Sequence, residues 1–253
     1  MHPLAALFIC LAINMAAFFP AYIWQTDRLT DICYALTFVA VAAYGLAKSG
    51  ATAANLTVFT MICLWAVRLG GFLFIRVHTL GADSRFDAIR TDFLKFGAFW
   101  LLQGFTVWMM MLPGTLFFAN RVKRVPLLAF IGIALWLAGL LMETVADWQK
   151  YQFITNPANS GKWIDIGLWR YSRHPNYFGE ILVWLGIYIY TWFGLSLTQS
   201  LVGLLSPLLI SLLLLFVSGI PLLEKKADKR HGDNPQYRSY KAKTNVLIPW
   251  PPG

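Results

Sequence analysis

Long apolar segments alternate with short polar ones along the whole chain. Each apolar segment has about the 20 residues that a helix needs to cross the ~30 Å hydrocarbon core of a bilayer. The segments are 3–24, 32–48, 54–77, 96–119, 126–148, 176–194 and 200–221. Because lipid offers the backbone no hydrogen-bond partners, each is expected to be an α-helix, whereas the strands of a membrane barrel would alternate in polarity. The pattern predicts an all-α integral membrane bundle of about seven transmembrane helices.

Composition supports a membrane protein. Of the 253 residues, 58% are hydrophobic and 13% are charged, whereas a soluble domain carries about a quarter charged residues. The sequence shows no internal repeat and no nucleic-acid-binding module. We therefore interpret residues 1–253 as one membrane-embedded domain, with 1–50 as support helices and 54–249 as the core.

The basic residues predict how the chain lies in the membrane. With seven spans, sixteen lysines and arginines fall on the face that holds the C-terminus and four on the other face. Lys and Arg accumulate in cytoplasmic loops, so the C-terminus and the loops 78–95 and 150–175 are predicted to be cytoplasmic, as in a bacterial inner-membrane protein. The formal net charge of +9 fits this rule. The excess positive charge could also bind anionic lipid headgroups or a phosphate-bearing ligand.

Among the ionisable residues inside the apolar segments, four are predicted to be buried, namely Arg68, Glu143, Asp147 and Glu180. Charges at such depth are costly and usually mark a site or a pathway. Helical spacing directs the polar faces of three segments toward the cytoplasmic half of the bundle, which predicts one polar cavity there. The alternative is that these residues form internal salt bridges that only hold the helices together.

The loop before the sixth segment, WIDIGLWRYSRHPNYFGE at 163–180, is the most specific local feature. Pro175 suits the first turn of a helix, and the amides of that turn attract anions. Arg170, Arg173 and His174 surround this helix start, so the loop predicts a site for a phosphate or a carboxylate. The aromatic residues of the region could stack on a ligand ring or form an interfacial belt; they are Trp163, Trp169, Tyr171 and Tyr177.

The segment 224–249 is too polar to cross a membrane. It could be a solvated basic anchor. It could also be a lid over the cavity, with Lys225, Lys229 or Arg230 reaching a phosphate. The three cysteines lie inside apolar segments and the four histidines are scattered, so no metal site is predicted.

Several of these segments resemble the steroid 5-alpha-reductase-like membrane enzymes, specifically the bacterial group DUF1295. The resemblance rests on SRHPNYFGE at 172–180, WAVRLGGFLFIR at 65–76, DSRFDAIR at 83–90 and the tail at 219–249. It covers most of the chain from the third segment onward. Isoprenylcysteine carboxyl methyltransferases, which share the fold, have a similar RHPxYxG segment and tail.

The resemblance implies a helical bundle that holds NADPH in its cytoplasmic half, with a lipid-facing cavity for a steroid-like substrate. Residues matching Arg68, Asp147, Tyr171, Asn176 and Glu180 line the cofactor pocket of the reductases, and basic residues of the 150–175 loop and tail would hold the phosphates. The full predicted cofactor-binding set is Arg68, Arg76, Asp147, Lys150, Arg170, Tyr171, Arg173, His174, Asn176, Tyr177, Glu180, Lys225, Lys229 and Arg230.

One position differs from the reductases that act on 3-oxo-4-ene steroids. Those enzymes carry a tyrosine three residues before the matching arginine, where this chain has Trp65. An indole N–H can donate a hydrogen bond but does not deliver a proton to an enolate. The predicted proton donor is therefore Tyr177 or Tyr171, with Glu180 organising the site.

The leading hypothesis is an NADPH-dependent reductase of a C=C bond in a lipophilic, steroid- or isoprenoid-like substrate that arrives through the membrane lipids. The first alternative is an S-adenosylmethionine-dependent methyltransferase of a prenylated or lipid substrate. The second is a lipid-binding protein without catalysis. The many cations around the predicted cavity favour NADPH, because its phosphates need them. Neither a nucleic acid nor an obligate protein partner is expected.

Overall fold

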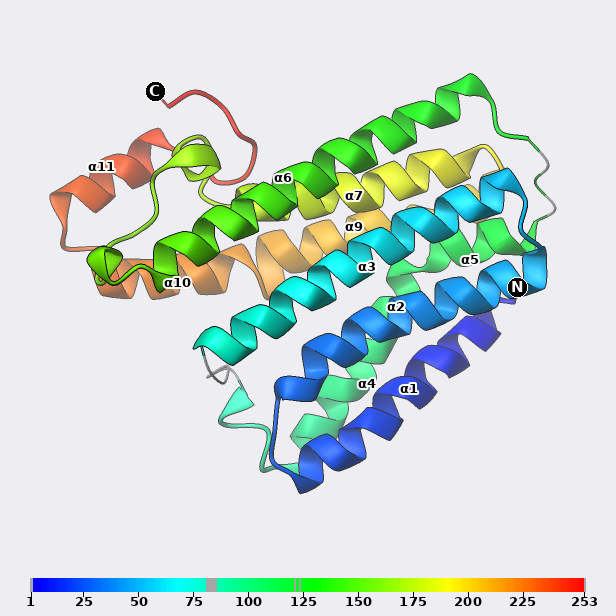
Figure 1. Cartoon of the computed structure of the whole chain (residues 1–253), viewed down its shortest axis with the longest axis horizontal. Coiled ribbons are helices and arrows are strands. Elements are labelled where there is room, and N and C mark those ends of the chain that lie inside the picture. Colours follow the sequence, from blue (N-terminus) through cyan, green and yellow to red (C-terminus); the bar gives the residue numbers. More distant parts are fainter. Residues whose placement is uncertain (1, 81–85, 121, 123, 253) are drawn as a thin grey trace. The chain divides into compact units, whose positions relative to one another are not determined.

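The computed structural model describes residues 2–80, 86–120, 122 and 124–252. These residues form helices joined by turns and short loops (Figure 1), which confirms the all-α fold. Residues 83–85 of the DSRFDAIR motif lie outside the described residues. So do Arg121 and Lys123, which, like Arg85, are among the basic residues that predict the orientation of the chain in the membrane.

Within the described part of the chain, six helical segments are long and apolar enough to cross a membrane: Pro3–Ile23, Arg28–Ser49, Ala53–Thr79, Phe93–Met110, Leu127–Thr155 and Leu197–His231. The chain is thus a multi-pass membrane protein. The predicted segment 176–194 forms the helix α7 (Pro175–Trp192) but is not among the six. Polar residues such as Asn176 and Glu180 make it less apolar, so the predicted count of seven is not confirmed.

The chain divides into two compact units, described here separately. The first comprises Met1–Gly132 and Ile187–Ser206, and the second comprises Ile133–Gly186 and Pro207–Gly253. Both α6 (Phe130–Thr155) and α7 therefore contribute residues to both units. That the whole chain acts as one domain stays a prediction.

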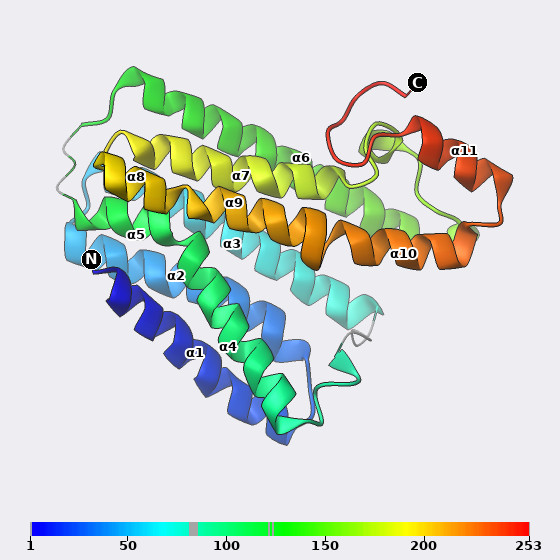
Figure 2. The ribbon, with the colours of Figure 1, turned by 180° about the vertical axis from the view of Figure 1, so that it is seen from behind.

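The first unit contains α1 (Pro3–Ile23), α2 (Arg28–Ser49), α3 (Ala53–Leu80), α4 (Phe93–Met110), α5 (Leu112–Ala119) and α8 (Leu197–Gly203). Helix α1 packs against α2 and α4, and α2 packs against α3 and α5 (Figure 2). The predicted single helix over 96–119 is broken at Met111. Pro113 lies in the first turn of α5, where its missing N–H suits a helix start but could not continue α4.

A buried polar cluster joins three helices of this unit. The side-chain amide of Asn14 on α1 donates to the hydroxyl of Thr37 on α2 at 3.3 Å and to the carbonyl of Cys10 at 2.8 Å. Gln103 on α4 donates to Oδ1 of Asn14 at 2.9 Å. Such bonds hold helices together in lipid, where the helices lack a hydrophobic driving force for association.

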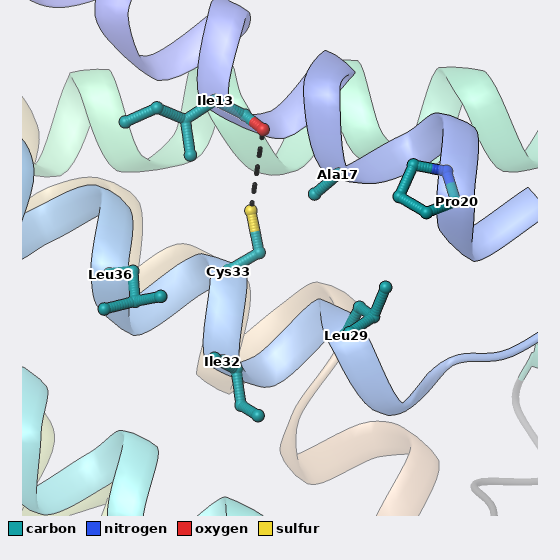
Figure 3. Close-up of a pocket in the computed structure, with 7 residues that line it drawn as sticks. All are labelled: Ile13, Ala17, Pro20, Leu29, Ile32, Cys33 and Leu36. Carbon is teal, nitrogen blue, oxygen red and sulfur yellow. Dashed lines mark hydrogen bonds between the residues drawn. The ribbon is translucent and has the colours of Figure 1, made fainter.

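An apolar pocket also lies in the first unit, between α1 and α2 (Figure 3). Its lining residues are Ile13, Ala17, Pro20, Leu29, Ile32, Cys33 and Leu36. The only polar side-chain group there is the thiol of Cys33, whose Sγ lies 3.9 Å from the carbonyl oxygen of Ile13. The lining suits hydrocarbon, so this pocket is not the predicted polar cavity.

The second unit contains most of α6 and the first two-thirds of α7, followed by α9 (Leu205–Leu212) from Pro207 onward, a π-helical turn (Leu213–Val217), α10 (Ile220–His231) and α11 (Pro235–Lys243). Helix α6 continues to Thr155, beyond the predicted end at residue 148. Its last two turns carry Lys150 and Tyr151. The helix ends immediately before Asn156-Pro157, because a proline disfavours the helical conformation of the residue before it.

Candidate functional site

Two glycines set the distance between α6 and α7. A Cβ at Gly139 on α6 would lie 2.6 Å from the carbonyl oxygen of Gly179 on α7, and a Cβ at Gly179 would lie 2.6 Å from the backbone nitrogen of Glu143. Both distances are too short for any side chain. Small residues allow such close backbone approach between membrane helices. The contact brings the stretch of α6 from Glu143 to Asp147 beside the first turns of α7.

Carboxylates and an amide meet at this contact. Asn176 in the first turn of α7 donates through Nδ2 to Oδ1 of Asp147 on α6 at 3.1 Å. Asp147 is 6% exposed and Glu143 is 2% exposed, while Glu180 on α7 is half-buried. The second unit thus gathers three of the four predicted intramembrane ionisable residues on two adjacent helices.

The two predicted arginines of α3 belong to the first unit. The guanidinium of Arg68 lies 5.6 Å from the ring centroid of Phe72. Arg76 lies 3.9 Å from the carboxylate of Asp31 on α2. A pocket that Arg68 shares with the acidic residues of α6 and α7 stays a prediction.

The loop between α6 and α7 is anchored by Trp169, which is 3% exposed. Its indole N–H donates to the carbonyl of Ala146 at 3.0 Å, and the ammonium of Lys150 lies 4.6 Å from its ring centroid. Gln149 accepts a hydrogen bond of 2.9 Å from the backbone N–H of Leu168. Trp169 and Lys150 therefore engage each other, and the loop is held against the cytoplasmic end predicted for α6.

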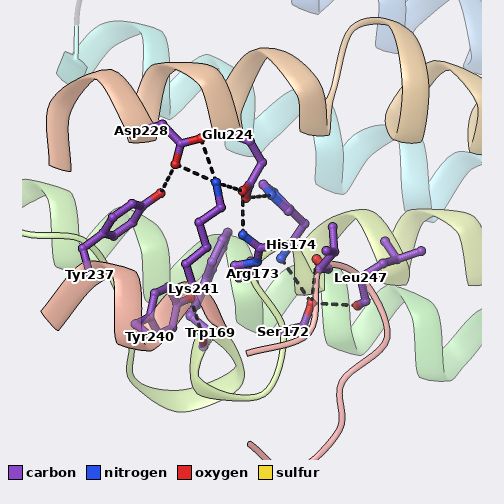
Figure 4. Close-up of polar contacts among 11 residues, drawn as sticks. Trp169, Ser172, Arg173, His174, Glu224, Asp228, Tyr237, Tyr240, Lys241 and Leu247 are labelled. Atoms are coloured by element: carbon purple, nitrogen blue, oxygen red, sulfur yellow. Dashed lines mark hydrogen bonds and ion pairs between the residues drawn. The ribbon is translucent and has the colours of Figure 1, made fainter. Parts of the chain in front are cut away.

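The C-terminal tail is fastened to the same loop. The backbone N–H of Arg173 donates to the carbonyl of Asn245 at 2.8 Å, and the hydroxyl of Ser172 donates to the carbonyl of Leu247 at 2.7 Å. Ser172 and Asn245 also form a parallel backbone bridge. Two regions about 70 residues apart in the sequence are thereby paired directly before α7 begins (Figure 4).

Glu224 on α10 is the centre of the ionic contacts in this region (Figure 4). Its carboxylate accepts from Nη1 of Arg173 at 2.6 Å and lies 2.9 Å from Nε2 of His174. Nζ of Lys241 on α11 lies 3.1 Å from the same carboxylate. Glu224 was not among the predicted site residues. The sequence signal was modest, since Glu224 is the first charged residue after the last apolar segment and is followed at once by lysines.

The His174 ring is buried beside two cations and one carboxylate. Burial lowers the pKa of His174, and the charges of Lys150 and Arg173 lower it further, although the hydrogen bond to Glu224 acts in the opposite direction. A neutral ring that donates from Nε2 leaves Nδ1 as an acceptor. Among the described residues, neither Nδ1 of His174 nor Nε of Arg173 has a hydrogen-bond partner, and both atoms are buried.

The remaining predicted residues of the second unit differ in exposure. The half-buried ring of Tyr177 lies parallel to the His174 ring, with centroids 5.6 Å apart and an interplanar angle of 10°. Tyr171 is 40% exposed. The other predicted cations all lie on the surface: Arg170, Lys225, Lys229 and Arg230. Tyr177 is therefore less exposed than Tyr171.

The described residues of the second unit offer carboxylates, an amide and cations as hydrogen-bonding groups. Within the ranges that the structure describes, no three or more His, Cys, Asp or Glu side chains are grouped so as to hold a metal ion. Buried carboxylates and an amide on α6 and α7 can accept from and donate to hydroxyl or amide groups. Arg173, whose buried Nε has no partner among the described residues, and the surface cations can bind phosphate. This combination suits a ligand that carries both kinds of group.

Comparison with known proteins gives a family match over most of the chain. The model of the family described as "Protein of unknown function (DUF1295)" matches residues 17–244. This confirms the resemblance to the DUF1295 group of steroid 5-alpha-reductase-like proteins. A protein of Schizosaccharomyces pombe that is described as uncharacterized is 27% identical over 138 residues, which cover 47% of this chain and only 38% of the yeast protein. No solved structure gives a significant match.

Proposed function

This chain belongs to the DUF1295 family, and we propose that it is an NADPH-dependent membrane reductase. Its substrate is a lipophilic, steroid- or isoprenoid-like molecule with a reducible C=C bond. The family is linked to the 5-alpha-reductase-like enzymes, and the family match includes every candidate residue of the second unit. The proposal extends that link to a cofactor, a reaction and a substrate class.

One observation carries the cofactor assignment. The hydrogen-bonded pair Asp147 and Asn176 lies at the start of α7, immediately after the loop that carries Arg170 and Arg173. NADPH has hydroxyl and amide groups that such a pair can bind, and phosphates that need cations. The unused buried Nε of Arg173 supports a ligand with several acceptor oxygens. The residues present therefore fit the cofactor.

The chain's own residues would supply binding, orientation and a proton, while bound NADPH supplies a hydride. Tyr177 is the preferred proton donor because its phenol is half-buried on a rigid helix, whereas Tyr171 is 40% exposed. Glu180 lies one helical turn beyond Asn176 and would orient the polar end of the site. In this proposal the C-terminal tail faces the cytoplasm of a bacterial cell, where NADPH is present, and the substrate enters from the inner-membrane lipids.

An S-adenosylmethionine-dependent methyltransferase is the second candidate, and the Glu224 contacts favour it. Glu224 already engages Arg173, His174 and Lys241, which reduces the number of cations available to phosphates. S-adenosylmethionine needs few cations, since it offers one carboxylate, and its sulfonium can lie against aromatic rings. The two candidates therefore differ in the charge that the site must neutralise.

Thermal unfolding of the purified full chain in detergent tests the proposal. NADPH is expected to raise the unfolding temperature in a concentration-dependent way, while S-adenosylmethionine at equal concentration leaves it unchanged. The opposite pattern would identify the methyltransferase. Stabilisation by added lipid alone, with no effect of either cofactor, would indicate the non-catalytic lipid-binding protein and refute the reductase.

A further inference from the structure

We propose that Glu224 is an internal occupant of an anion site at the start of α7, and that a phosphate group of the incoming ligand displaces it. The inference rests on the proposed function in that the ligand carries phosphates. It adds a residue and a mode of regulation that the family resemblance does not supply. The exchange makes Glu224 a competitor of the ligand rather than a part of its binding surface.

The contacts of Glu224 are those that an oxyanion would make. Its two carboxylate oxygens lie 2.6 Å from Nη1 of Arg173 and 2.9 Å from Nε2 of His174, on two consecutive residues (Figure 4). Lys241 approaches from α11 at 3.1 Å. A carboxylate and a phosphate use the same charge-assisted hydrogen bonds, and a planar guanidinium binds either of them through parallel N–H groups. The two anions would therefore compete for the same donors.

Glu224 leaves part of this site unsatisfied. Arg173 meets Glu224 through Nη1, but its buried Nε has no partner among the described residues. Buried polar atoms without partners are unusual in native structures and commonly bind an ion, a ligand or a water. A phosphate offers more acceptor oxygens than a carboxylate and could bind Nε and Nη1 of Arg173 together.

The backbone before Glu224 allows α10 to move. A π-helical turn over Leu213–Val217 ends α9, and a break at Gly219 precedes α10. Gly219 adopts φ −96° and ψ −104°, and a Cβ there would collide with the carbonyl oxygen of Leu214. π-Helical turns and such glycine breaks commonly mark functional hinges. In the proposed exchange, helix α10 rotates about this break while α9 stays in place.

Release of Glu224 need not release the tail. Lys241 also contacts the carboxylate of Asp228, one turn further along α10, at 2.6 and 2.7 Å. The pairing of Ser172 with Asn245 and Leu247 uses backbone groups and a hydroxyl that do not involve α10. These contacts would hold the tail while Glu224 leaves Arg173, so the exchange is local.

The test compares Glu224→Gln with Asp228→Asn in the full chain purified in detergent. Inorganic pyrophosphate is the probe, and isothermal titration calorimetry measures its affinity. Glu224→Gln removes the competing charge and is expected to bind pyrophosphate about tenfold more tightly than the wild type, the scale of one charged hydrogen bond, although its unfolding temperature falls. Asp228→Asn weakens the same tail without touching Arg173, so its affinity should stay within about twofold of the wild type.

A purely structural role for Glu224 predicts a different result. Both the unfolding temperature and the pyrophosphate affinity of Glu224→Gln would then fall, or the affinity would not change, and either outcome overturns the proposal. The double variant Glu224→Gln with Arg173→Gln should lose the gain in affinity. If the double variant kept the gain, the anion would bind elsewhere and the proposal would fail.

A second measurement needs no variant. On addition of pyrophosphate to the wild type, backbone amides of α10 are expected to exchange hydrogen faster, because the Glu224 contacts are lost. Unchanged or slower exchange in Ile220–His231 would overturn the displacement.

The failure of the cofactor proposal can be distinguished from the failure of the displacement of Glu224. If Glu224→Gln binds pyrophosphate more tightly but neither the wild type nor the variant binds NADPH, only the cofactor proposal is refuted. If NADPH binds but Glu224→Gln gains no pyrophosphate affinity, only the displacement of Glu224 is refuted.

Discussion

Asn176 donates a hydrogen bond of 3.1 Å to Asp147, and this bond joins the first turn of α7 to α6. A carboxylate that is 6% exposed in a membrane protein carries a large desolvation cost, and such groups usually belong to functional sites. The pair also marks the point where the buried acids of α6 approach the cationic loop. It is the structural basis of the cofactor proposal.

Replacing Asp147 by Asn is expected to weaken NADPH binding about tenfold or more, because a carboxylate that accepts from ligand hydroxyl groups is lost. The dissociation constant measured by fluorescence titration of NADPH checks this. Asp233→Asn is the matched control, since Asp233 is an exposed acid of the tail and should leave the affinity unchanged. Equal effects of the two substitutions would argue against a role for Asp147 in binding.

Gly179→Ala should destabilise the protein by about 1–3 kcal/mol, the usual cost of overpacking. The added methyl would lie 2.6 Å from the backbone nitrogen of Glu143 and 2.7 Å from the carbonyl of Gly139, so α6 and α7 must separate. Gly71→Ala in α3 is the control, because nothing lies within 4 Å of its Cβ position. That variant should be neutral or slightly stabilised, since alanine favours a helix. Thermal unfolding in detergent measures both.

Stability should fall as the pH is lowered through about 6.5, the ordinary pKa of histidine. Burial lowers the pKa of His174 in the folded protein, so in this range the unfolded chain binds a proton that the folded protein does not. By linkage, the stabilisation is present above pH 6.5 and is lost below it. His174→Gln should show a smaller drop in unfolding temperature between about pH 7.5 and 5.5 than the wild type. A steeper drop in the variant would contradict the assignment.

Asn14→Ala should cost the first unit about 1 kcal/mol, the scale of a hydrogen bond between membrane helices. It removes one acceptor of Gln103 and the donor to Thr37, so that polar groups on α2 and α4 each lose one of their hydrogen bonds. Gln152→Ala, at an exposed position of α6, serves as the control. If both variants unfold at the wild-type temperature, the buried cluster contributes nothing measurable.

The sequence predicted the helices well, because apolar runs in a membrane protein permit little else. The end of α1 at Ile23 and the start of α7 at Pro175 lie within one residue of the prediction. The sequence did not predict the break at Met111, because residues 96–119 form one continuous run without a charged residue. The polar segment 224–249 holds most of α10 and all of α11, which are short helices rich in polar residues, although the candidate span Leu197–His231 includes its first eight residues.

The site was harder to predict than the helices. Helical spacing placed Glu143 and Asp147 on one face of α6, and the loop motif indicated Arg173 and His174. Spacing within one segment could not reveal Glu224, because its partners lie about 50 residues earlier in the chain. Only the tertiary pairing of the tail with the loop brings them together. The close approach of Gly139 and Gly179 was not predicted for the same reason, since α6 and α7 each contain two glycines and the sequence does not show which of them meet.

A density map of the full chain purified with NADPH tests the central claim most directly. The account predicts a dinucleotide in the second unit, with polar groups of the ligand on Asp147 and Asn176 and a phosphate on Arg173. Density for S-adenosylmethionine or lipid at those residues, or a dinucleotide bound away from all three, would contradict it.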